Sequence, residues 1–399
     1  MRILHCIATY APAWNWGGPV VSTAALCEGL AELGHEVTVF TTTAGLDGSF
    51  DGLVAERGGV TVHYFRRQPG IGIKSQELET AMAEKVSNFD IVHVTGVWQR
   101  TARAACRAAT QAGVPYIMSP RGALGSYAWR QKTIKKAAYY LLYERRNIAG
   151  TAGFHLTCSM EAKECAYFLR DRVSRVIPNG VLQPDWVRDD AGAKQWRKEN
   201  RFAEGTPIFL YIGRLHRTKG LDLLPSALER LGSRPWNMAF LGVDEDGTGA
   251  ALAKAFAALR MTDRIRFLPT CSKPELRAAY SAASVFLLPS RYDSFGNVVI
   301  EALGCGCPAL VSDGVGVGAD AEGSGAVTVL PRDPAVWAQQ LKNYLDGTWT
   351  PIAPGPTATW VHARFSKKPV AQRMAEFYSE LVHAHPSLGV DRKIHWEKP

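Results

Sequence analysis

Two series of short apolar segments, one in each half of the chain, alternate with helical segments, and this alternation most constrains the fold. The first series comprises Arg2–Ile7, Glu36–Thr41, Val60–Phe65, Ile91–Val94, Tyr116–Met118 and Gly153–Thr157. The second comprises Ile208–Ile212, Met238–Leu241, Arg264–Phe267, Val285–Leu288, Ala309–Val311 and Ala326–Leu330. Strands that alternate with helices form parallel sheets covered on both faces. The pattern predicts an α/β protein of two Rossmann-like, doubly wound units that face a cleft, with ligands at the carboxyl ends of the strands.

Several helices are recognisable between these strands and after them. Apolar residues at helical spacing run through Ser22–Leu33, and Arg100–Ala112 has a similar pattern. Each is followed by a glycine, which closes a helix readily. Near the C-terminus, Lys368–Leu381 has the spacing of an amphipathic helix, whereas the Pro- and Thr-rich Ile352–Thr359 predicts a linker.

The alternation is interrupted around Ile177–Val181. With 399 residues the chain is long for one hydrophobic core and sufficient for two. The turn Ile-Pro-Asn-Gly-Val and the polar stretch after it therefore predict a boundary between an N-terminal domain, 1–180, and a C-terminal domain, 181–366. We expect a helix within 367–384 to cross back to the N-terminal domain, and 385–399 to form a tail.

The formal net charge of +9 attracts anions without identifying them. Because no nucleic-acid recognition motif accompanies the charge, we expect no nucleic-acid partner and consider phosphorylated substrates and anionic lipid instead. The eight cysteines are scattered without zinc-ligand spacing, which predicts reduced thiols rather than a metal site. No apolar run approaches ~20 residues, and the first residues do not resemble a signal peptide. We therefore expect a cytoplasmic protein.

The densest group of chemically informative residues follows the fourth strand of the second series. Asp293 lies in a polar turn there, just before a helix predicted to open near Ser294 or Phe295. Glu301 lies eight residues after Asp293, about two helical turns on, so both carboxylates can address one ligand. A capping aspartate and an ordinary surface glutamate would explain the pair alone. Gly296, however, permits close approach of a ligand to the backbone, and a helix N-terminus suits a phosphate.

Two further turns carry groups that suit phosphate. Arg214 and Lys219 bracket the turn after the first strand of the second series. A guanidinium fork and an ammonium together form a suitable clamp for a diphosphate. Gly17 and Gly18 follow the first strand of the chain, where their backbone N–H groups can approach a phosphate, although two glycines also make any turn.

Together these motifs resemble glycosyltransferase family 4, a large group of retaining enzymes with the GT-B fold. The order is a Gly-Gly loop, the Ile-Pro-Asn-Gly-Val boundary, Gly-Arg-x4-Lys-Gly and Pro-Ser-x3-Ser-Phe-Gly-x4-Glu-Ala-x-Gly-x-Gly-x-Pro. The resemblance spans nearly the whole chain, from Arg2 to the helix ending near Leu381. The C-terminal motif is specific to the family, and the N-terminal ones are not.

The resemblance implies a nucleotide-diphosphate sugar donor held mainly by the C-terminal domain. Arg214 and Lys219 would hold the diphosphate, Glu301 the ribose hydroxyls and Asp293 the transferred sugar. Further donor contacts would come from Gly17, Gly18, Ser294, Phe295, Gly296 and Asn297. The reaction would retain the anomeric configuration without a metal or another cofactor, because the two cations stabilise the leaving diphosphate.

Two positions depart from the family pattern. Asp293 is one methylene shorter than the glutamate that family members usually have there, which can alter sugar contacts. Arg121, in a Ser-Pro-Arg-Gly sequence, takes the place of a histidine that contacts the donor sugar in many members. Arginine cannot act as a base, but it can bind a phosphate or an acceptor carboxylate. The proton route is therefore unassigned; in retaining front-face mechanisms the leaving phosphate can itself take the acceptor proton.

Three weaker signals allow two interpretations each. The sequence Asp244-Glu245-Asp246 resembles an Asp-x-Asp metal motif, but its position after a strand favours a polar loop. His93, at a strand end, is a hydrogen-bonded core residue or lines the cleft. Trp98 and Trp129 either stack on a sugar or fill the core.

The stretch from Tyr127 to Arg146 is strongly basic, with Glu144 as its single acid. Its cations are Arg130, Lys132, Lys135, Lys136, Arg145 and Arg146. The apolar residues that recur at helical spacing are Ile134, Ala138, Leu141 and Ile148. Such a helix either approaches anionic lipid or a lipid-diphosphate acceptor, or is docked against the domain with its charges in solvent.

The sequence thus predicts a hexosyltransferase that uses a nucleotide-sugar donor and a saccharide or polyprenyl-diphosphate-linked acceptor. By family analogy it acts in cell-surface polysaccharide biosynthesis at the inner face of a membrane. Two alternatives remain: a GT-B nucleotide-sugar epimerase or hydrolase, and a nucleotide-sugar-binding homologue without turnover, which Asp293 and Arg121 prompt.

Overall fold

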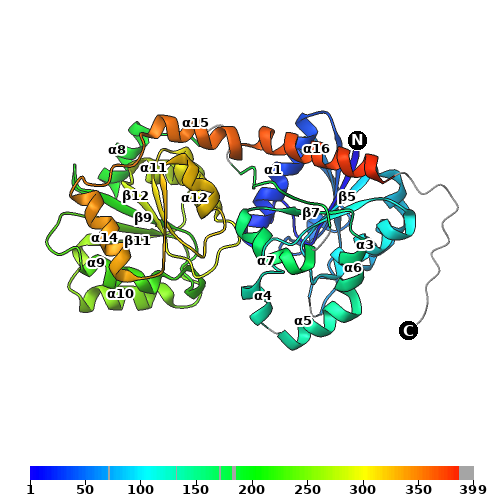
Figure 1. The fold of residues 1–399 in the computed structure, drawn as a ribbon, viewed down its shortest axis with the longest axis horizontal. Helices are drawn as coiled ribbons and strands as arrows, with labels where there is room; N and C mark the ends of the chain where they lie inside the picture. The colour runs from blue at the N-terminus through cyan, green and yellow to red at the C-terminus, as the bar shows by residue number, and fades with distance from the viewer. Residues whose placement is uncertain (71, 132, 170–171, 182–185, 386–399) are drawn as a thin grey trace. The chain divides into compact units, whose positions relative to one another are not determined.

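The computed structural model contains two α/β units, each with its own sheet and core (Figure 1). It describes residues 1–70, 72–131, 133–169, 172–181 and 186–385. The first unit comprises Met1–Thr157, Glu161–Gly180 and the described residues from Lys367 on, and the second comprises Cys158–Met160 and Val181–Ser366. Lys132 and the predicted tail from residue 386 on lie outside the described residues.

Eight strands form the sheet of the first unit. In spatial order they are β3 (Val54–Arg57), β4 (Val60–Phe65), β2 (Glu36–Thr42), β1 (Arg2–Ile7), β5 (Ile91–Thr95), β6 (Tyr116–Ser119), β7 (Gly153–Leu156) and β8 (Ser174–Val176). All neighbours are parallel except β3 and β4, which pair antiparallel. The strand order changes direction between β1 and β5, and the loops at such a switch point commonly bind ligands.

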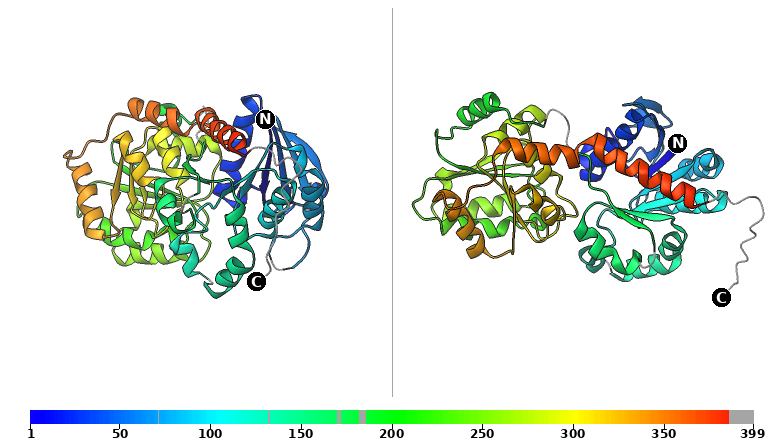
Figure 2. Two further views of the ribbon diagram at one scale, coloured as in Figure 1. Left: turned by 45° about the vertical axis from the view of Figure 1, so that its right-hand side comes forward. Right: turned by 45° about the horizontal axis from the view of Figure 1, so that its top comes forward.

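Helices cover this sheet, and the last described helix of the chain is one of them. They are α1 (Gly18–Glu32), α2 (Gln76–Lys85), α3 (Arg100–Ala112), α4 (Ser126–Arg130), α5 (Thr133–Tyr139), α6 (Arg145–Gly150), α7 (Ser159–Leu169) and α16 (Lys367–Ala384). Figures 1 and 2 show α16 lying against α1. A Cβ at Gly29 of α1 would lie 2.9 Å from that of Ala371, so glycine lets the two helices approach closely.

A chain of hydrogen bonds through buried histidines ties α16 to the sheet. The phenol oxygen of Tyr378 lies 2.6 Å from Nδ1 of His93, whose Nε2 lies 2.7 Å from Oγ of Ser119. Ser119 Oγ lies 2.7 Å from Nδ1 of His155, and Nε2 of His155 lies 2.8 Å from the carbonyl oxygen of Ile177. A carbonyl only accepts, so His155 donates to Ile177 and its other nitrogen accepts from the Ser119 hydroxyl. Ser119 then accepts from His93, and His93 accepts from the Tyr378 hydroxyl.

These histidines are neutral members of the core. Burial lowers the pKa of His93 and His155 well below the usual value, and lowers that of the neighbouring His5 to about 3. His93 is fully buried, so of its two sequence interpretations the hydrogen-bonded core residue is confirmed. Trp98 and Trp129 likewise pack against each other, with ring centroids 5.2 Å apart. Seven of the eight cysteines are buried, as expected of thiols that pack as small apolar groups.

Six parallel strands form the sheet of the second unit. In spatial order they are β11 (Ile265–Leu268), β10 (Asn237–Leu241), β9 (Ile208–Ile212), β12 (Val285–Leu288), β13 (Ala309–Ser312) and β14 (Val327–Leu330). The helices are α8 (Asp190–Glu199), α9 (Leu224–Glu229), α10 (Thr248–Ala258), α11 (Lys273–Ala282), α12 (Asn297–Gly304), α13 (Gly318–Ala321), α14 (Pro334–Leu345) and α15 (Pro354–Phe365). Here the switch point lies between β9 and β12.

Some sequence predictions of local structure were wrong. The predicted linker forms α15 from Pro354 on, because proline is tolerated in the first turn of a helix and Thr357, Val361 and Phe365 form one buried face. In the first unit, α1 begins at Gly18 rather than at Ser22. In the second unit, α12 begins at Asn297, two to three residues later than predicted, after the left-handed Gly296.

The basic stretch comprises the short helix α4 and one continuous helix, residues 133–150, within which five residues form a π-helical turn. The continuous helix consists of α5, the π-helical turn η4 (Tyr140–Glu144) and α6. Ile148 is buried, but Ile134 and Leu141 are 87% and 67% exposed. None of the described helices is both long enough and apolar enough to cross a bilayer.

Candidate active site

The predicted phosphate clamp lies in the second unit, on the loops after the adjacent strands β9 and β12. The backbone N–H of Arg291 donates to the carbonyl of Thr218 at 2.8 Å and joins the two loops. Gly220 has a left-handed φ of +63°, and a Cβ there would lie 2.2 Å from the carbonyl oxygen of Pro289. Only glycine therefore allows the loops to come this close. The sheet brings the two motifs together at its switch point.

Lys219 and Asp293 form an ion pair that joins these two loops. The Lys219 Nζ atom lies 2.6 Å from Asp293 Oδ2, and the two side chains are 19% and 17% exposed. Lys219 ends the 3₁₀ turn η5 (Arg217–Lys219), which Gly220 closes. Asp293 is held through its backbone, which bonds to Gly314 and Gly316. The ammonium is thus fixed in position while it remains accessible from one side.

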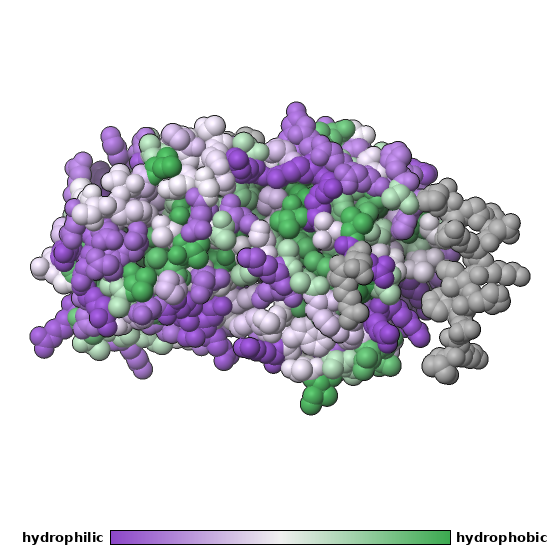
Figure 3. Space-filling view, in the orientation of Figure 1, coloured by the Kyte–Doolittle hydropathy of each residue, from purple (hydrophilic) through white to green (hydrophobic). Residues whose placement is uncertain are grey.

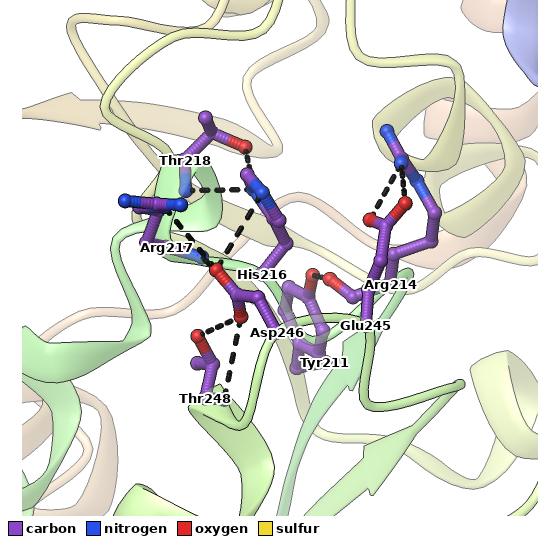
Figure 4. Close-up of polar contacts among 8 residues, drawn as sticks. All are labelled: Tyr211, Arg214, His216, Arg217, Thr218, Glu245, Asp246 and Thr248. Atoms are coloured by element: carbon purple, nitrogen blue, oxygen red, sulfur yellow. Dashed lines mark hydrogen bonds and ion pairs between the residues drawn. The ribbon is translucent and has the colours of Figure 1, made fainter.

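Arg214 has a carboxylate partner that the sequence analysis did not assign to it. Its Nη1 donates to both carboxylate oxygens of Glu245, at 2.8 and 2.6 Å (Figure 4). The two side chains are 63% and 43% exposed, so the pair lies in water and contributes little to stability. An incoming diphosphate can replace Glu245 as the partner of the guanidinium.

The other carboxylates of the acidic loop hold backbone and side chains in place. Asp246 accepts a hydrogen bond from the Arg217 backbone N–H at 3.2 Å and from the Thr248 hydroxyl at 2.6 Å, and these bonds lower its pKa (Figure 4). His216 Nε2 lies 3.5 Å from the same carboxylate. Asp244 accepts from the N–H of Ala250, in the first turn of α10. The loop therefore supports the Arg214–Lys219 turn.

The start of α12 places the remaining residues of the C-terminal motif. Gly296 has a φ of +95° and precedes the helix. Phe295 is buried, with its ring 6.4 Å from that of Phe365, so only its backbone is left for a ligand. Ser294 and Asn297 are partly exposed on either side of the glycine. The first N–H groups of α12 lack helical partners and can bind an anion or a hydroxyl.

Glu301 lies on α12 in a strongly desolvated position. Burial raises its pKa to about 6, although the hydroxyl of Tyr280 donates to Oε2 at 3.1 Å. One carboxylate oxygen is thereby oriented by the protein. The arrangement suits a carboxylate that accepts hydrogen bonds from a ligand's hydroxyl groups.

In the first unit, Gly17 and Gly18 form the start of α1 after β1. Gly17 has a φ of +97° and is the residue before the helix, and a Cβ there would meet no atom within 4 Å. The space beside its backbone is therefore open. Helix α1 is 15 residues long, and its unpaired N–H groups can receive a phosphate.

Arg121, which follows β6, is a cation with a neutral partner. Its Nη1 donates to the amide oxygen of Asn179, and its Nε is buried without a hydrogen bond. Burial lowers the pKa of the guanidinium. The neighbouring Glu161 accepts from the backbone N–H groups of Gly122 and Thr157. Among the described residues Arg121 forms no salt bridge, and the charge of the nearby Glu161 only partly offsets the lowering of its pKa. A bound anion can therefore pair with the guanidinium.

The sequence analysis identified Arg214 and Glu301 but not their protein partners, Glu245 and Tyr280. Glu245 and Tyr280 lie 31 and 21 residues from Arg214 and Glu301, and only the sheet order brings them together. The position of Glu245 directly after β10, which pairs with β9, was the available signal.

Two family models match the chain. The model described as glycosyl transferases group 1 matches residues 192–351, and the glycosyl transferase 4-like domain matches residues 17–180. Among similar proteins, a D-inositol 3-phosphate glycosyltransferase of Corynebacterium efficiens is 32% identical over 56% of this chain, and the match spans about half, 54%, of that protein. One of Streptomyces avermitilis is 26% identical over 92% of this chain and 84% of its own length.

Solved structures resemble the whole chain. Sucrose-phosphate synthase from Thermosynechococcus elongatus superimposes with a TM-score of 0.77 at 20% identity, covering 96% of this chain and 100% of that one. The Anabaena protein HepE, in complex with UDP and glucose, gives a TM-score of 0.74 at 18% identity, covering 95% of this chain and 100% of that one. Both likenesses concern the fold.

Proposed function

The chain belongs to glycosyltransferase family 4 and has the GT-B fold, and from this premise we propose that it transfers a hexose from a nucleotide-diphosphate sugar with retention of configuration. The observation that carries the proposal is the Lys219–Asp293 ion pair, 2.6 Å long, at the switch point of the second sheet. It places an ammonium beside a carboxylate, as a donor with an anionic diphosphate and a hydroxyl-rich sugar requires.

The donor is a nucleoside diphosphate sugar in this proposal. Lys219 and Arg214 bind the diphosphate, Asp293 accepts hydrogen bonds from the sugar, and Glu301 accepts from the ribose hydroxyls. The first N–H groups of α1 and α12 bind phosphate or sugar oxygens. The similar Anabaena protein was solved with UDP and glucose, and with UDP-glucose, which supports uridine donors as the first to be tested.

The chemistry follows from the two cations. The bond between the anomeric carbon and the diphosphate breaks, and the acceptor oxygen forms a new bond to the same face of that carbon. The acceptor proton passes to the leaving diphosphate. Lys219 and Arg214 stabilise the negative charge that develops on this group, without a metal ion. The engagement of Asp244, Glu245 and Asp246 with protein donors supports a metal-independent reaction.

The acceptor carries an anionic group in this proposal, because Arg121 is buried, its hydrogen bond goes to the neutral Asn179, and it forms no salt bridge among the described residues. Relatives are named for D-inositol 3-phosphate, a phosphorylated compound, which supports the same chemical class. A saccharide with a carboxylate or phosphate, or a saccharide linked to polyprenyl diphosphate, satisfies this requirement. Such acceptors fit a role in cell-surface polysaccharide biosynthesis.

The test measures binding first and turnover second. A thermal-shift screen against UDP-, GDP- and ADP-sugars is expected to select one nucleotide, and the selected donor is then incubated with anionic and neutral acceptors with and without EDTA. Transfer with retained anomeric configuration, unaffected by EDTA, is expected. A product formed without an acceptor would instead indicate an epimerase or hydrolase. Binding without turnover on every acceptor would contradict the transferase assignment.

A further inference from the structure

A surface of the first unit combines exposed apolar side chains with cations that form no ion pair with any residue the structure describes. We call it the α4–α6 surface, and it lies on α4, α5, η4 and α6. Its apolar members are Ile134, Ala138, Leu141 and Leu142, and its cations are Arg130, Lys135, Arg145 and Arg146. None of these side chains belongs to the proposed donor and acceptor sites.

The apolar side chains form one outward stripe. Ile134 is 87% exposed, Leu141 67% and Leu142 59%. Ile134, Ala138 and Leu142 follow each other at intervals of four residues, so they share one side of a helix. Figure 3 shows hydrophobic atoms protruding at the lower edge of the molecule, where Figure 1 draws α5. Single exposed apolar residues are common, but a contiguous stripe marks an interaction surface.

The segment is held firmly from behind, so its exposure is a property of the fold. Glu144 is buried and accepts from the backbone N–H of Trp98 at 2.9 Å, which anchors the π-helical turn. The guanidinium of Arg103 lies 3.6 Å from the centre of the Tyr143 ring. Ile148 packs into the core. With this side fixed inward, Leu141 and Leu142 both project outward.

The cations of the surface pair with no carboxylate among the described residues. Within the part of the chain that the structure describes, none of Arg130, Lys135, Arg145 and Arg146 forms a salt bridge. The single acid of the stretch, Glu144, is turned into the core. The surface therefore carries uncompensated positive charge around an apolar stripe, which is the pattern of helices that lie in a membrane interface.

An aromatic groove adjoins the surface. It has a volume of about 440 Å³ and is lined by Leu124, Ser126, Trp129, Tyr140, Glu164, Tyr167 and Phe168. Tyr167 is 64% exposed at its edge. Aromatic rings with one polar atom are favoured at the depth of lipid headgroups. The groove thus extends the same type of surface.

We propose that the α4–α6 surface docks the protein on an anionic bilayer, with Ile134, Leu141 and Leu142 inserted among the headgroups and the four cations on lipid phosphates. Charge complementarity selects this occupant. A neutral partner protein would leave the cations unpaired, and a polyanion without an apolar phase would leave the stripe in water. Each cation near an anionic membrane strengthens binding by roughly fivefold, or about 1 kcal/mol.

The test is flotation of the full chain with vesicles of phosphatidylcholine alone or mixed with phosphatidylglycerol. Wild-type protein is expected to float with the mixed vesicles only, and less at high salt. The variant Lys135→Gln/Arg146→Gln is expected to bind roughly 30-fold more weakly, and Ile134→Ser/Leu142→Ser roughly tenfold more weakly.

Matched controls change the same residue types elsewhere. Lys198→Gln/Lys254→Gln removes two exposed cations of the second unit, and Ile352→Ser replaces an apolar residue that is 48% exposed. Both controls are expected to float like the wild type. Equal binding of all variants, or equal binding to neutral and mixed vesicles, would overturn the proposal. The proposal would also be overturned if the variants of the α4–α6 surface lost self-association in sedimentation velocity but floated like the wild type. The surface would then join two copies of the chain.

Discussion

The two sheets end in loops of different electrostatic character. After β9 and β12 of the second unit, Lys219 and Arg214 each pair with a carboxylate of the same unit, Asp293 and Glu245. After β6 of the first unit, Arg121 bonds to the neutral Asn179. It also lies near the three buried histidines, whose pKa values its charge helps to lower.

The cations of the second unit thus have carboxylate partners in the protein, whereas Arg121 of the first unit is hydrogen-bonded to a neutral amide. A cation with a carboxylate partner loses little when a ligand phosphate replaces that partner, so such a site suits a donor that binds and leaves in each cycle. A desolvated cation with only an amide oxygen gains more from a charged ligand. The first unit is therefore better suited to select among acceptors.

The largest effect expected of any substitution is that of Lys219→Ala. It removes the half-buried cation that we propose stabilises the leaving diphosphate, and kcat is expected to fall by roughly 100- to 1000-fold. Arg234→Ala, which breaks the exposed pair with Asp346 in the same unit, serves as the control and is expected to retain wild-type kcat. A kcat within threefold of wild type for Lys219→Ala would remove the diphosphate role.

The substitution Arg121→Gln is expected to affect binding of the acceptor and not binding of the donor. The KM for an anionic acceptor is expected to rise by roughly 10- to 100-fold, because a charge-assisted hydrogen bond is lost. The Kd of the donor, measured by calorimetry, is expected to stay unchanged. Arg175→Gln, which breaks an exposed pair with Glu380 in the same unit, is the matched control. An equal rise in KM for a neutral acceptor would show that Arg121 does not recognise charge.

Glu301 makes stability and donor binding depend on pH in opposite directions. Its pKa of about 6 exceeds the ordinary 4.5, so folding favours the protonated acid. The protonated side chain is stabilising below pH 4.5, and that contribution is lost as the pH rises through 6, a change of about 2 kcal/mol. Urea unfolding is expected to show wild type losing stability relative to Glu301→Gln over this interval. Donor binding is expected to improve over the same interval, because the ionised carboxylate is a better acceptor for the ribose hydroxyls that we propose it binds.

Glu229→Gln, on the exposed end of α9, is the control for this pH series and is expected to follow the wild type throughout. A constant difference in stability between wild type and Glu301→Gln from pH 4.5 to 7 would contradict the assigned shift.

The smallest effect is expected for Glu245→Gln. The diphosphate then no longer competes with a carboxylate for Arg214, and the donor Kd is expected to fall by roughly two- to threefold, the scale of an exposed ion pair. Asp346→Asn breaks a comparable pair away from the site and is expected to leave the donor Kd unchanged. Weaker donor binding in Glu245→Gln would mean that the carboxylate positions Arg214 instead.

Much of the fold was predictable because buried parallel strands are short apolar runs between helices. Ile208–Ile212 and Val285–Leu288, for example, are strands with the predicted bounds. The edge strands β3 and β8 were missed, since their exposed residues lack such a run. Helix α15 was missed because prolines and threonines dominate its first turns, and only tertiary burial of Val361 and Phe365 shows its apolar face.

The sequence predicted which residues belong to the candidate site, but not which protein side chains they contact. Arg214, Lys219, Asp293 and Glu301 were identified from their positions at strand ends and helix starts. Their contacts depend on sheet order, which a sequence of alternating segments does not reveal. The exposure of Ile134 was equally hidden, because helical spacing alone does not tell a face that docks on the protein from one that points outward.

The position of α16 has a consequence for synthesis on the ribosome. The hydroxyl of Tyr378 completes a core whose other members were translated some two hundred residues earlier or more. The N-terminal unit must therefore remain partly open, with the apolar surface of α1 uncovered, while residues 181–366 emerge and fold. A chain truncated before Lys367 would keep the residues of the second unit and lack the helix that covers α1, so its first unit is expected to be aggregation-prone.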